Sequence, residues 1–408
     1  MRSWRNLAVG AALALSAPVA GQLTVPSLPL PPVSRVVEGV TRPIGHAVGP
    51  VLTDARDLVR ARIKRLDELV RRNRGVIERD LSGQPARRGE LLLLDASPNE
   101  LAVASQAGFT VQERATIEEL GFAVVRVATP SGLSLAAAES KLEGLLPGAS
   151  VSADLLHFQA GGDALAAGDA TAGNGAAITT PVGVIDGASG AAIVPRATRG
   201  FARGAPLPSN HGSAIVSLLA AAGVRHVFVA DVYGADPAGG NALALARGLG
   251  WLVGQGARVV TISLVGPPSP VVARAIAAAQ THGVLIVAAV GNDGPAAPPA
   301  YPASYPGVLA VTAVDGRNRA LLEAGRALHL DYAAPGADML AADARGRWVK
   351  VRGTSYAAPL VAARAAAAWG PRPATITALD REARDLGAPG SDRAFGRGLL
   401  CAACRRTR

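Results

Sequence analysis

The sequence predicts an α/β protein in which a doubly wound parallel sheet follows a small α+β unit. From residue 179 onward, continuous apolar segments of strand length alternate with helical segments, a pattern typical of parallel sheets covered on both faces. Asp186 and Asn292 directly follow two of these apolar segments, at the sheet edge where open α/β sheets bind ligands. The order β-α-β-β-α-β over residues 90–158 predicts the small unit and is typical of a ferredoxin-like fold.

The composition allows a large apolar core and limits the choice of partners. The chain has 408 residues, enough for two or three domains; 49% are hydrophobic but only 4% aromatic, so we expect a core of mostly Ala, Val and Leu. The net charge of +10 is concentrated in residues 1–90, which hold 15 Arg and Lys against 8 Asp and Glu. The excess of positive charge belongs to the N-terminal region, and we expect no nucleic-acid partner.

The N-terminal part is predicted to contain a leader, a linker and a helix. Residues 1–21 combine a basic start, an apolar run and small residues, which is typical of a signal peptide, so we expect a secreted or periplasmic protein. Residues 22–89 combine a Pro-rich linker with a basic amphipathic helix, which the apolar spacing predicts over 53–74. This helix is expected to pack on a neighbouring domain; contact with an anionic membrane surface is the alternative.

The small unit and the segment after it differ sharply in composition. In the unit at 90–158, the predicted strands are 90–96, 109–117, 122–128 and 150–158, and the predicted helices are 98–107 and 133–146. The segment at 159–178 consists mainly of Gly, Ala, Asp, Thr and Asn, which predicts a flexible linker.

The large unit, residues 179–408, carries the alternating strands and helices of the parallel sheet. The predicted strands are 182–186, 227–232, 259–264, 284–290 and 308–314, and the predicted helices are 211–222, 242–254, 271–282 and 355–369. Because the strands are apolar along their whole length, we expect helices on both faces of this sheet.

Four residues of the large unit form a hydrolytic pattern, in the order Asp186, His211, Asn292, Ser355. A serine hydroxyl needs a neighbouring base, and histidine suits that role because its pKa lies close to neutral pH. A carboxylate behind the histidine fixes its tautomer, and an asparagine amide can donate to a developing oxyanion. The free N–H groups at the start of the helix predicted over 355–369 favour the same oxyanion, and Pro359 is expected early in that helix, where a missing N–H costs least.

Short strings around these residues resemble those of the subtilisin-like serine peptidases (subtilases). The string GTSYAAP at 353–359 is close to the family's nucleophile motif, AAVGN at 288–292 is similar to its oxyanion strand, and VTISLVG at 260–266 is similar to the strand lining its substrate cleft. The resemblance covers about 179–403 and includes the chain order of the triad. Two flanks differ: Gly187 and Ala188 follow the acid, and the string HGSA at 211–214 lacks the family's usual second histidine.

The resemblance implies a serine endopeptidase that hydrolyses polypeptides, with a subtilisin-like catalytic domain at 179–408. It implies that the unit at 90–158 is a pro-domain, which assists folding and inhibits the active site within the same chain. We expect the precursor to cut itself between Gln159 and Thr180.

The resemblance also implies a set of substrate-binding residues. They are Ser263, Leu264, Val265, Gly266, Ala289, Gly291 and Ala300. None is charged, so we expect a small or apolar side chain before the scissile bond. Val265 stands where the family usually has Gly, which should narrow the cleft.

Two other interpretations stay open. The altered flanks are compatible with a catalytically silent subtilase fold that acts in binding or regulation. The basic helix is compatible with a protein that works at a membrane or on a partner, with hydrolysis secondary. A lipase or esterase is disfavoured because no Gly-x-Ser-x-Gly string surrounds Ser355.

No cofactor is expected. The sequence shows no acidic loop with convincing calcium-ligand spacing, and two cysteines alone do not complete a zinc site. Cys401 and Cys404 are predicted to form a local disulfide or to remain two idle thiols. The other histidines are expected to be packed or surface residues; they are His46, His157, His226, His282 and His329.

Overall fold

A seven-stranded parallel sheet forms the centre of the large unit in the computed structural model, which describes residues 48–160, 165–166 and 176–405. Its strands, in spatial order, are β15 (Tyr332–Pro335), β14 (Leu309–Val314), β13 (Leu285–Ala289), β11 (Val259–Ile262), β8 (Val182–Asp186), β10 (Val227–Asp231) and β9 (Ala197–Gly200). The predicted α/β class and parallel sheet are therefore confirmed. The sequence did not predict β9 or β15.

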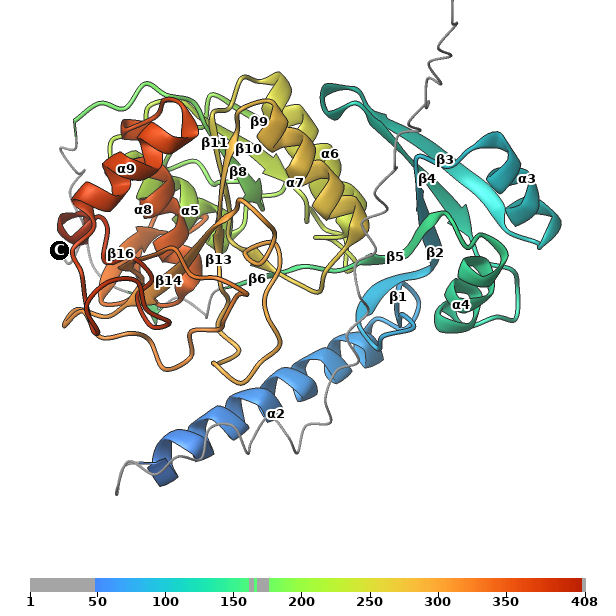
Figure 1. Ribbon diagram of the computed structural model, residues 1–408, viewed down its shortest axis with the longest axis horizontal. Coiled ribbons are helices and arrows are strands. Elements are labelled where there is room, and N and C mark those ends of the chain that lie inside the picture. The colour runs from blue at the N-terminus through green and yellow to red at the C-terminus, as the bar shows by residue number, and fades with distance from the viewer. Residues whose placement is uncertain (1–47, 161–164, 167–175, 406–408) are drawn as a thin grey trace, which may run out of the picture. The chain divides into compact units, whose positions relative to one another are not determined.

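Helices cover both faces of this sheet, as its fully buried strands require (Figure 1). One face packs on α5 (Asn210–Ala221) and α8 (Thr354–Ala367), and the other on α6 (Ala242–Gly254) and α7 (Pro270–Thr281). Three of these helices start at a side chain that accepts a backbone N–H; the capping residues are Ser209, Asn241 and Ser269. The remaining elements are β7 (Leu165–Ala166), β12 (Leu264–Val265), β16 (Met339–Ala342), β17 (Trp348–Val351), α9 (Arg372–Glu382) and η2 (Ala402–Cys404).

The small unit has the predicted β-α-β-β-α-β order. Its main elements are β2 (Pro85–Leu94), α3 (Pro98–Gln106), β3 (Thr110–Ile117), η1 (Glu118–Leu120), β4 (Phe122–Ala128), α4 (Leu135–Leu145) and β5 (Ser150–Leu155). The antiparallel strands lie in the order β5-β2-β4-β3. An additional strand, β1 (Ile77–Arg79), pairs with the start of β2, so this sheet begins before the predicted boundary at residue 90. The predicted strand 150–158 ends at Leu155 and is followed by a separate short strand, β6 (Phe158–Gln159).

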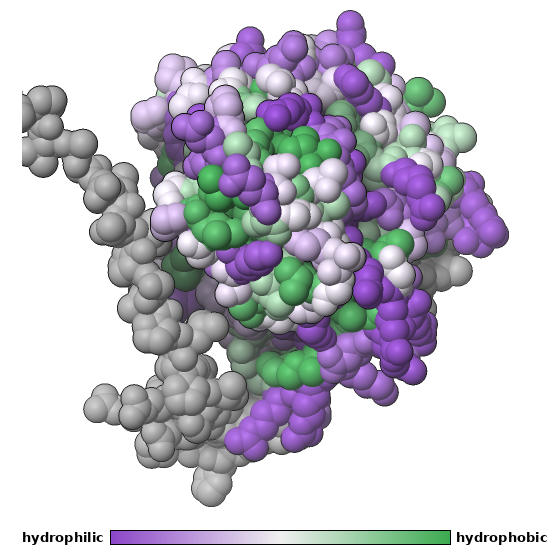
Figure 2. Space-filling view, turned by 90° about the vertical axis from the view of Figure 1, so that its right-hand side faces the viewer, coloured by the Kyte–Doolittle hydropathy of each residue, from purple (hydrophilic) through white to green (hydrophobic). Residues whose placement is uncertain are grey.

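The two faces of the small sheet pack on different partners. Leu91 and Leu93 of β2 lie in a core with residues of α3 and α4. Leu92, between them, points to the opposite face and belongs to the core that contains α6 and α7. The side of the molecule seen in Figure 2 carries hydrophobic patches separated by hydrophilic residues. Residues 51–408 accordingly form one compact unit, in which the small sheet and the large domain share apolar contacts.

Charged groups surround this shared core. The buried Asp154 of β5 accepts from the N–H of Leu243 at the start of α6, at 3.1 Å. Burial raises the pKa of Asp154 to about 7. At the margin, Arg87 pairs with Asp236 at 2.7 Å, and Glu113 pairs with Arg247.

The N-terminal helix α2 spans Val48–Arg72. It therefore begins before the predicted start at 53 and ends shortly before the predicted end at 74. Within the described residues, no helix combines the length and apolar character needed to cross a bilayer. The predicted signal peptide at 1–21 and nearly all of the predicted linker before α2 lie outside the described residues.

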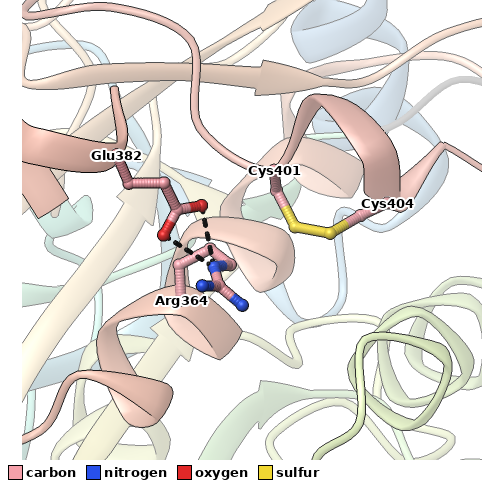
Figure 3. Close-up of a disulfide and its surroundings, with 4 residues drawn as sticks. All are labelled: Arg364, Glu382, Cys401 and Cys404. Carbon is pink, nitrogen blue, oxygen red and sulfur yellow. Dashed lines mark hydrogen bonds and ion pairs between the residues drawn. A yellow bond between two sulfur atoms is a disulfide. The ribbon is translucent and has the colours of Figure 1, made fainter. Parts of the chain in front are cut away.

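The two cysteines near the C-terminus form a disulfide, Cys401–Cys404 (Figure 3). Beside it, Arg364 of α8 donates to both carboxylate oxygens of Glu382 at the end of α9, at 2.8 and 2.9 Å. The disulfide therefore lies next to the ion pair that joins α8 to α9. Of the two alternatives from the sequence, the structure has the local disulfide.

Glu139 of α4 offers a test of the small unit's stability. Its buried carboxylate accepts from the N–H of Ala153 at 2.9 Å and from the N–H of Leu81 at 2.8 Å. In a Ser355→Ala background, Glu139→Ala is expected to lower the free energy of unfolding by about 1–3 kcal/mol, because two N–H groups lose their acceptor. Urea denaturation measures this, with Glu143→Ala, an exposed position on the same helix, as control. Equal midpoints for the two variants would contradict the assignment.

Candidate active site

Asp186 and His211 lie in direct contact at the carboxyl edge of the sheet. Asp186 is the last residue of β8, and His211 is the second residue of α5. His211 Nδ1 lies 2.8 Å from Asp186 Oδ2, and both side chains are buried. Asp186 Oδ1 accepts from the N–H of Gly187 at 2.7 Å. The carboxylate therefore holds a proton on Nδ1 and leaves Nε2 as the basic nitrogen.

The residues that flank this pair are part of its packing. A Cβ atom on Gly212 would lie 2.0 Å from the carbonyl oxygen of Gly187, so only glycine allows α5 to approach the end of β8 this closely. A Cβ atom on Gly187 would lie 2.4 Å from Ser209 Oγ, the capping hydroxyl of α5. Ser213 Oγ accepts from the N–H of Gly190 and donates to the carbonyl oxygen of Ser209. The two flanks that differ from the family pattern thus form a hydrogen-bonded junction of their own.

Ser355 is fully buried near the start of α8. Its hydroxyl donates to the carbonyl oxygen of Ser263 at 3.3 Å, and the hydroxyl of Ser263 donates to the carbonyl oxygen of Ser355 at 2.8 Å. Pro359 is the sixth residue of α8, later than expected from the sequence. Its missing N–H would have bonded the carbonyl oxygen of Ser355, so Ser263 takes over the role of donor there.

Asn292 reaches the start of the same helix from the loop after β13. Its Oδ1 accepts from the N–H of Thr354 at 3.0 Å. The Thr354 hydroxyl in turn accepts from the N–H of Gly291 at 3.0 Å and donates to its carbonyl oxygen at 3.1 Å. These contacts fix the orientation of the Asn292 amide, whose Nδ2 donates to the carbonyl oxygen of Ala160. The sequence did not single out Thr354 for this role, although it stands inside the GTSYAAP string.

The carbonyl oxygen of Ala160 lies between Asn292 and Ser355. It accepts from Asn292 Nδ2 and from the N–H of Ser355, the latter at 3.3 Å. A Cβ atom on Gly353 would lie 2.7 Å from Asn292 Nδ2 and 3.2 Å from this oxygen, so glycine is required at the helix start. The two donors thus converge on one carbonyl oxygen of the same chain, the arrangement expected of an oxyanion hole.

The residues before Ala160 form an extended tail across the site. Here β6 pairs antiparallel with β12, and the N–H of Ala160 donates to the carbonyl oxygen of Ser263 at 3.0 Å. The N–H of His157 donates to the carbonyl oxygen of Gly240 at 2.8 Å. Gln159 Nε2 also donates to Asp186 Oδ1 at 3.0 Å. The sequence assigned Gln159 and Ala160 to a flexible linker at 159–178, and for these two residues that prediction was wrong.

His157 lies wholly inside the site. Its side chain is fully buried, and neither ring nitrogen has a hydrogen-bond partner in the described part of the chain. A Cβ atom on Gly266 would lie 2.5 Å from His157 Cδ2, so this glycine makes room for the imidazole. Burial lowers the pKa of His157 to about 4. The sequence classed His157 as packed or exposed, and it is packed, but against the large domain.

The predicted substrate-binding residues lie around the tail with one exception. Ser263, Leu264 and Val265 make the backbone contacts just described, and Ala289 lies in the same apolar core as Ala160. Val265 Cγ1 lies 3.1 Å from where a Cβ atom of Gly291 would stand, so the Val265 side chain packs directly against Gly291. Ala300 bonds through its N–H to Arg326 and has no hydrogen bond to the tail among the described contacts.

Two polar atoms of the site, His211 Nε2 and Ser355 Oγ, differ in their hydrogen bonding. His211 Nε2 is buried and has no hydrogen-bond partner among the described residues. The hydroxyl of Ser355 faces Ser263 instead. Over the described ranges, no group of three or more His, Cys, Asp or Glu side chains is arranged to hold a metal ion.

Comparison with known proteins agrees with this geometry. Residues 202–398 match the family described as the Subtilase family. Subtilisin BL from Lederbergia lenta is 35% identical over 152 residues, which cover 37% of this chain and 56% of that protein. Subtilisin from Bacillus pumilus is 29% identical over 226 residues, which cover 52% and 81%. The match thus spans little more than half the length of the first of these relatives.

A solved structure supports the same fold. Fervidolysin from Fervidobacterium pennivorans, described as a keratinolytic enzyme related to subtilisin, has a TM-score of 0.62 and 17% identity, with 78% of this chain and 61% of that chain covered. This likeness concerns the fold alone. The family match covers somewhat less than half of the chain. With the related sequences it shows that this part of the chain is similar to the subtilases, and the fold agrees with that similarity.

Proposed function

We propose that this chain is an exported serine endopeptidase that cuts its own precursor and then hydrolyses peptide bonds of other polypeptides. The observation that carries the proposal is the Ala160 carbonyl oxygen held between Asn292 Nδ2 and the N–H of Ser355. The extended tail before it pairs with β12 as a bound peptide substrate would. Relatives named subtilisin and Minor extracellular protease Epr, from Bacillus subtilis, support hydrolysis and export.

The proposed chemistry begins at the Ala160–Gly161 bond. Ser355 Oγ turns from Ser263 toward His211, transfers its proton to Nε2 and bonds to the carbonyl carbon of Ala160. The negative charge that develops on the carbonyl oxygen is stabilised by Asn292 Nδ2 and by the N–H at the start of α8. Asp186 stabilises the imidazolium through Nδ1.

The second half of the reaction restores the enzyme. His211 gives its proton to the departing amine of Gly161 as the C–N bond breaks, which leaves Ala160 as an ester on Ser355. A water molecule then loses a proton to His211 Nε2 and attacks the ester carbonyl. When the ester bond breaks, the Ser355 oxygen regains this proton and Ala160 is released with a free carboxylate.

We propose that the small unit and its tail inhibit the site until they are removed. The tail fills the cleft from His157 to Ala160, and the small sheet shares an apolar core with α6 and α7. Because the contacts of both remain possible after the bond is cut, the cleaved pro-region is expected to stay bound as a product-like inhibitor.

A catalytically silent fold is the second candidate, and one observation favours it. The Ser355 hydroxyl bonds Ser263, while His211 Nε2 is left without a hydrogen bond in the described part of the chain. In this alternative, the tail is a permanent plug of a binding protein.

Chain length over time separates the two candidates. We expect the wild-type precursor to be cut once between Ala160 and Gly161, inside the predicted interval from Gln159 to Thr180, and Ser355→Ala to stay intact because it lacks the nucleophile. Mass spectrometry and N-terminal sequencing of the new fragment measure this, and reaction with a fluorophosphonate probe reports on the serine. If both chains stay intact and neither reacts with the probe, the silent fold is the better conclusion.

Val265 is predicted to restrict the residue before the scissile bond to small side chains. Its isopropyl group packs against Gly291 and on the apolar core that includes Ala160, so Val265→Gly should open space there for larger residues. We expect kcat/KM for peptides with Leu or Phe at this position to rise at least about tenfold, since accommodation of each extra apolar group changes it by roughly 10–200-fold. Hydrolysis of matched Ala peptides is the control. A wild-type preference for Lys or Arg would refute the prediction.

The pH is predicted to control release of the tail through His157. Burial holds the pKa of His157 at about 4, below the ordinary value of 6.5, although the backbone of Leu155, Gly240 and Pro267 favours the charged form. A pKa lowered in the bound state means that binding is strongest above pH 6.5 and weakens as the pH falls toward 4. The weakening can reach about 10²-fold, at roughly tenfold per unit of pKa difference.

The comparison with His157→Phe isolates this effect. Processed protein is held at pH 4.5–7.5, and free protease is then assayed at one fixed pH, so that titration of His211 does not enter. We expect release to increase at low pH in the wild type and to change less in the variant. The raised pKa of Asp154 strengthens binding as the pH falls, which opposes the effect of His157. This contribution is the same in the wild type and in the variant, so it cancels when their release rates are divided. Identical pH profiles would refute the role of His157.

A further inference from the structure

Helix α2 reaches the residue that directly follows Asn292. Arg62 Nε lies 3.1 Å from Asp293 Oδ2, and Arg65 contacts Asp293 Oδ1 at 2.6 Å. The Asp293 side chain is 20% exposed and Arg62 is 23% exposed, so this ion pair is largely shielded from solvent. Two guanidinium groups from a segment outside the small sheet therefore share one carboxylate at the margin of the oxyanion hole.

An apolar contact lies next to this ion pair. Gly294 has a φ of +83°, and a Cβ atom on it would lie 2.9 Å from Leu58 Cδ1. The missing side chain leaves a notch that Leu58 fills. Leu58, Arg62 and Arg65 are spaced four and three residues apart, so they lie on one face of α2. We call the surface formed by Asp293 and Gly294 the notch surface.

Other arginines of α2 pair within the helix itself. Arg60 pairs with Asp57 at 3.2 Å, and Arg71 and Arg72 pair with Glu68 at 3.4 and 2.7 Å. Their side chains are between 63% and 76% exposed. Arg65 is also 60% exposed, so Arg62 and Arg65 differ from these arginines in pairing with a carboxylate of the large domain. Arg60 and Arg71 lie on the face opposite Leu58, whereas Arg72 lies on the face of Leu58, about two turns beyond Arg65.

The notch surface is coupled to the site by its neighbours. The N–H of Gly294 donates to the carbonyl oxygen of Glu323 at 2.9 Å, and Glu323 pairs with Arg352, the residue before Gly353. On the other side, Asn292 bonds Thr354. A segment docked on Asp293 and Gly294 therefore rests on the loop that carries the oxyanion donor.

We propose that the notch surface is a docking site for a basic amphipathic helix, which α2 fills in the precursor, and that this contact keeps the pro-region on the enzyme after Ala160–Gly161 is cut. The inference rests on the proposed function. Because α2 is covalently joined to the small sheet, its docking is an intramolecular event once the sheet is bound, and two modest contacts combine into slow release. The contribution of the ion pair is expected to fall with added salt.

The test uses the full chain with Arg62→Ala and Arg65→Ala combined. Alanine is the strongest helix former, so α2 should stay helical. The matched control is Arg71→Ala with Arg72→Ala, which removes the same charge from the same helix. After processing, mass spectrometry measures the extent of cleavage at Ala160, and hydrolysis of a peptide measures how much enzyme is free of its pro-region.

We expect the Arg62/Arg65 variant to be cut as fast as the wild type but to release free enzyme at least about tenfold faster. The control should behave as the wild type, and 0.5 M salt, a concentration at which the Debye length is roughly 4 Å, should move the wild type toward the variant. Leu58→Ala should also speed release, independently of salt. Unchanged release in the Arg62/Arg65 and Leu58 variants would overturn the proposal.

Two outcomes identify different failures. If the wild type is not cut and never hydrolyses the peptide, the proposed function fails. If cleavage and activity are normal but the Arg62/Arg65 variant only loses binding to vesicles with anionic lipids, the docking proposal is overturned and the arginines serve a membrane contact.

Discussion

The N-terminus of α8 imposes the main constraint on this molecule. A helix start that is buried against the sheet exposes N–H groups that need acceptors. Asn292 Oδ1 satisfies the N–H of Thr354, and the carbonyl oxygen of Ala160 satisfies the N–H of Ser355. Gly353 permits this arrangement because any side chain there would collide with Asn292 Nδ2. The requirement to satisfy a buried helix end thus produces both the proposed oxyanion hole and the hydrogen bond that binds the tail.

Apolar packing and a buried hydrogen bond join the small unit to the large domain. Alternation along β2 directs Leu91 and Leu93 toward the unit's own helices and Leu92 toward the core around α6 and α7. Asp154 meets the N-terminus of α6, where free N–H groups favour a carboxylate. A sheet with apolar residues on both faces is only half covered by its own helices, so burial of the second face against the large domain is a consequence of its sequence.

The residues that flank Asp186 and His211 are accounted for by close packing. Gly187 makes room for the capping hydroxyl of Ser209, and Ser213 bonds the chain on both sides of the junction. At the opposite margin, Asp293 and Gly294 receive the basic face of α2. The site is therefore enclosed by three groups of segments that are distant in sequence: the end of β8 with α5, the loop after β13, and α2 with the tail before Ala160.

The sequence alone determined the alternation of strands and helices, the order of the four polar residues, and the β-α-β-β-α-β pattern of the small unit, because each depends on residues within one element or one short motif. It did not reveal β1 before residue 90, the late position of Pro359 in α8, or the ordered state of Gln159 and Ala160. Those features depend on partners far along the chain: Ser263 for the Ser355 carbonyl, β12 for the tail, and Asn292 for the Ala160 oxygen. Contacts between residues far apart in the sequence leave no local periodic pattern, so only the tertiary structure decided that the tail pairs with β12 and that α2 meets Asp293.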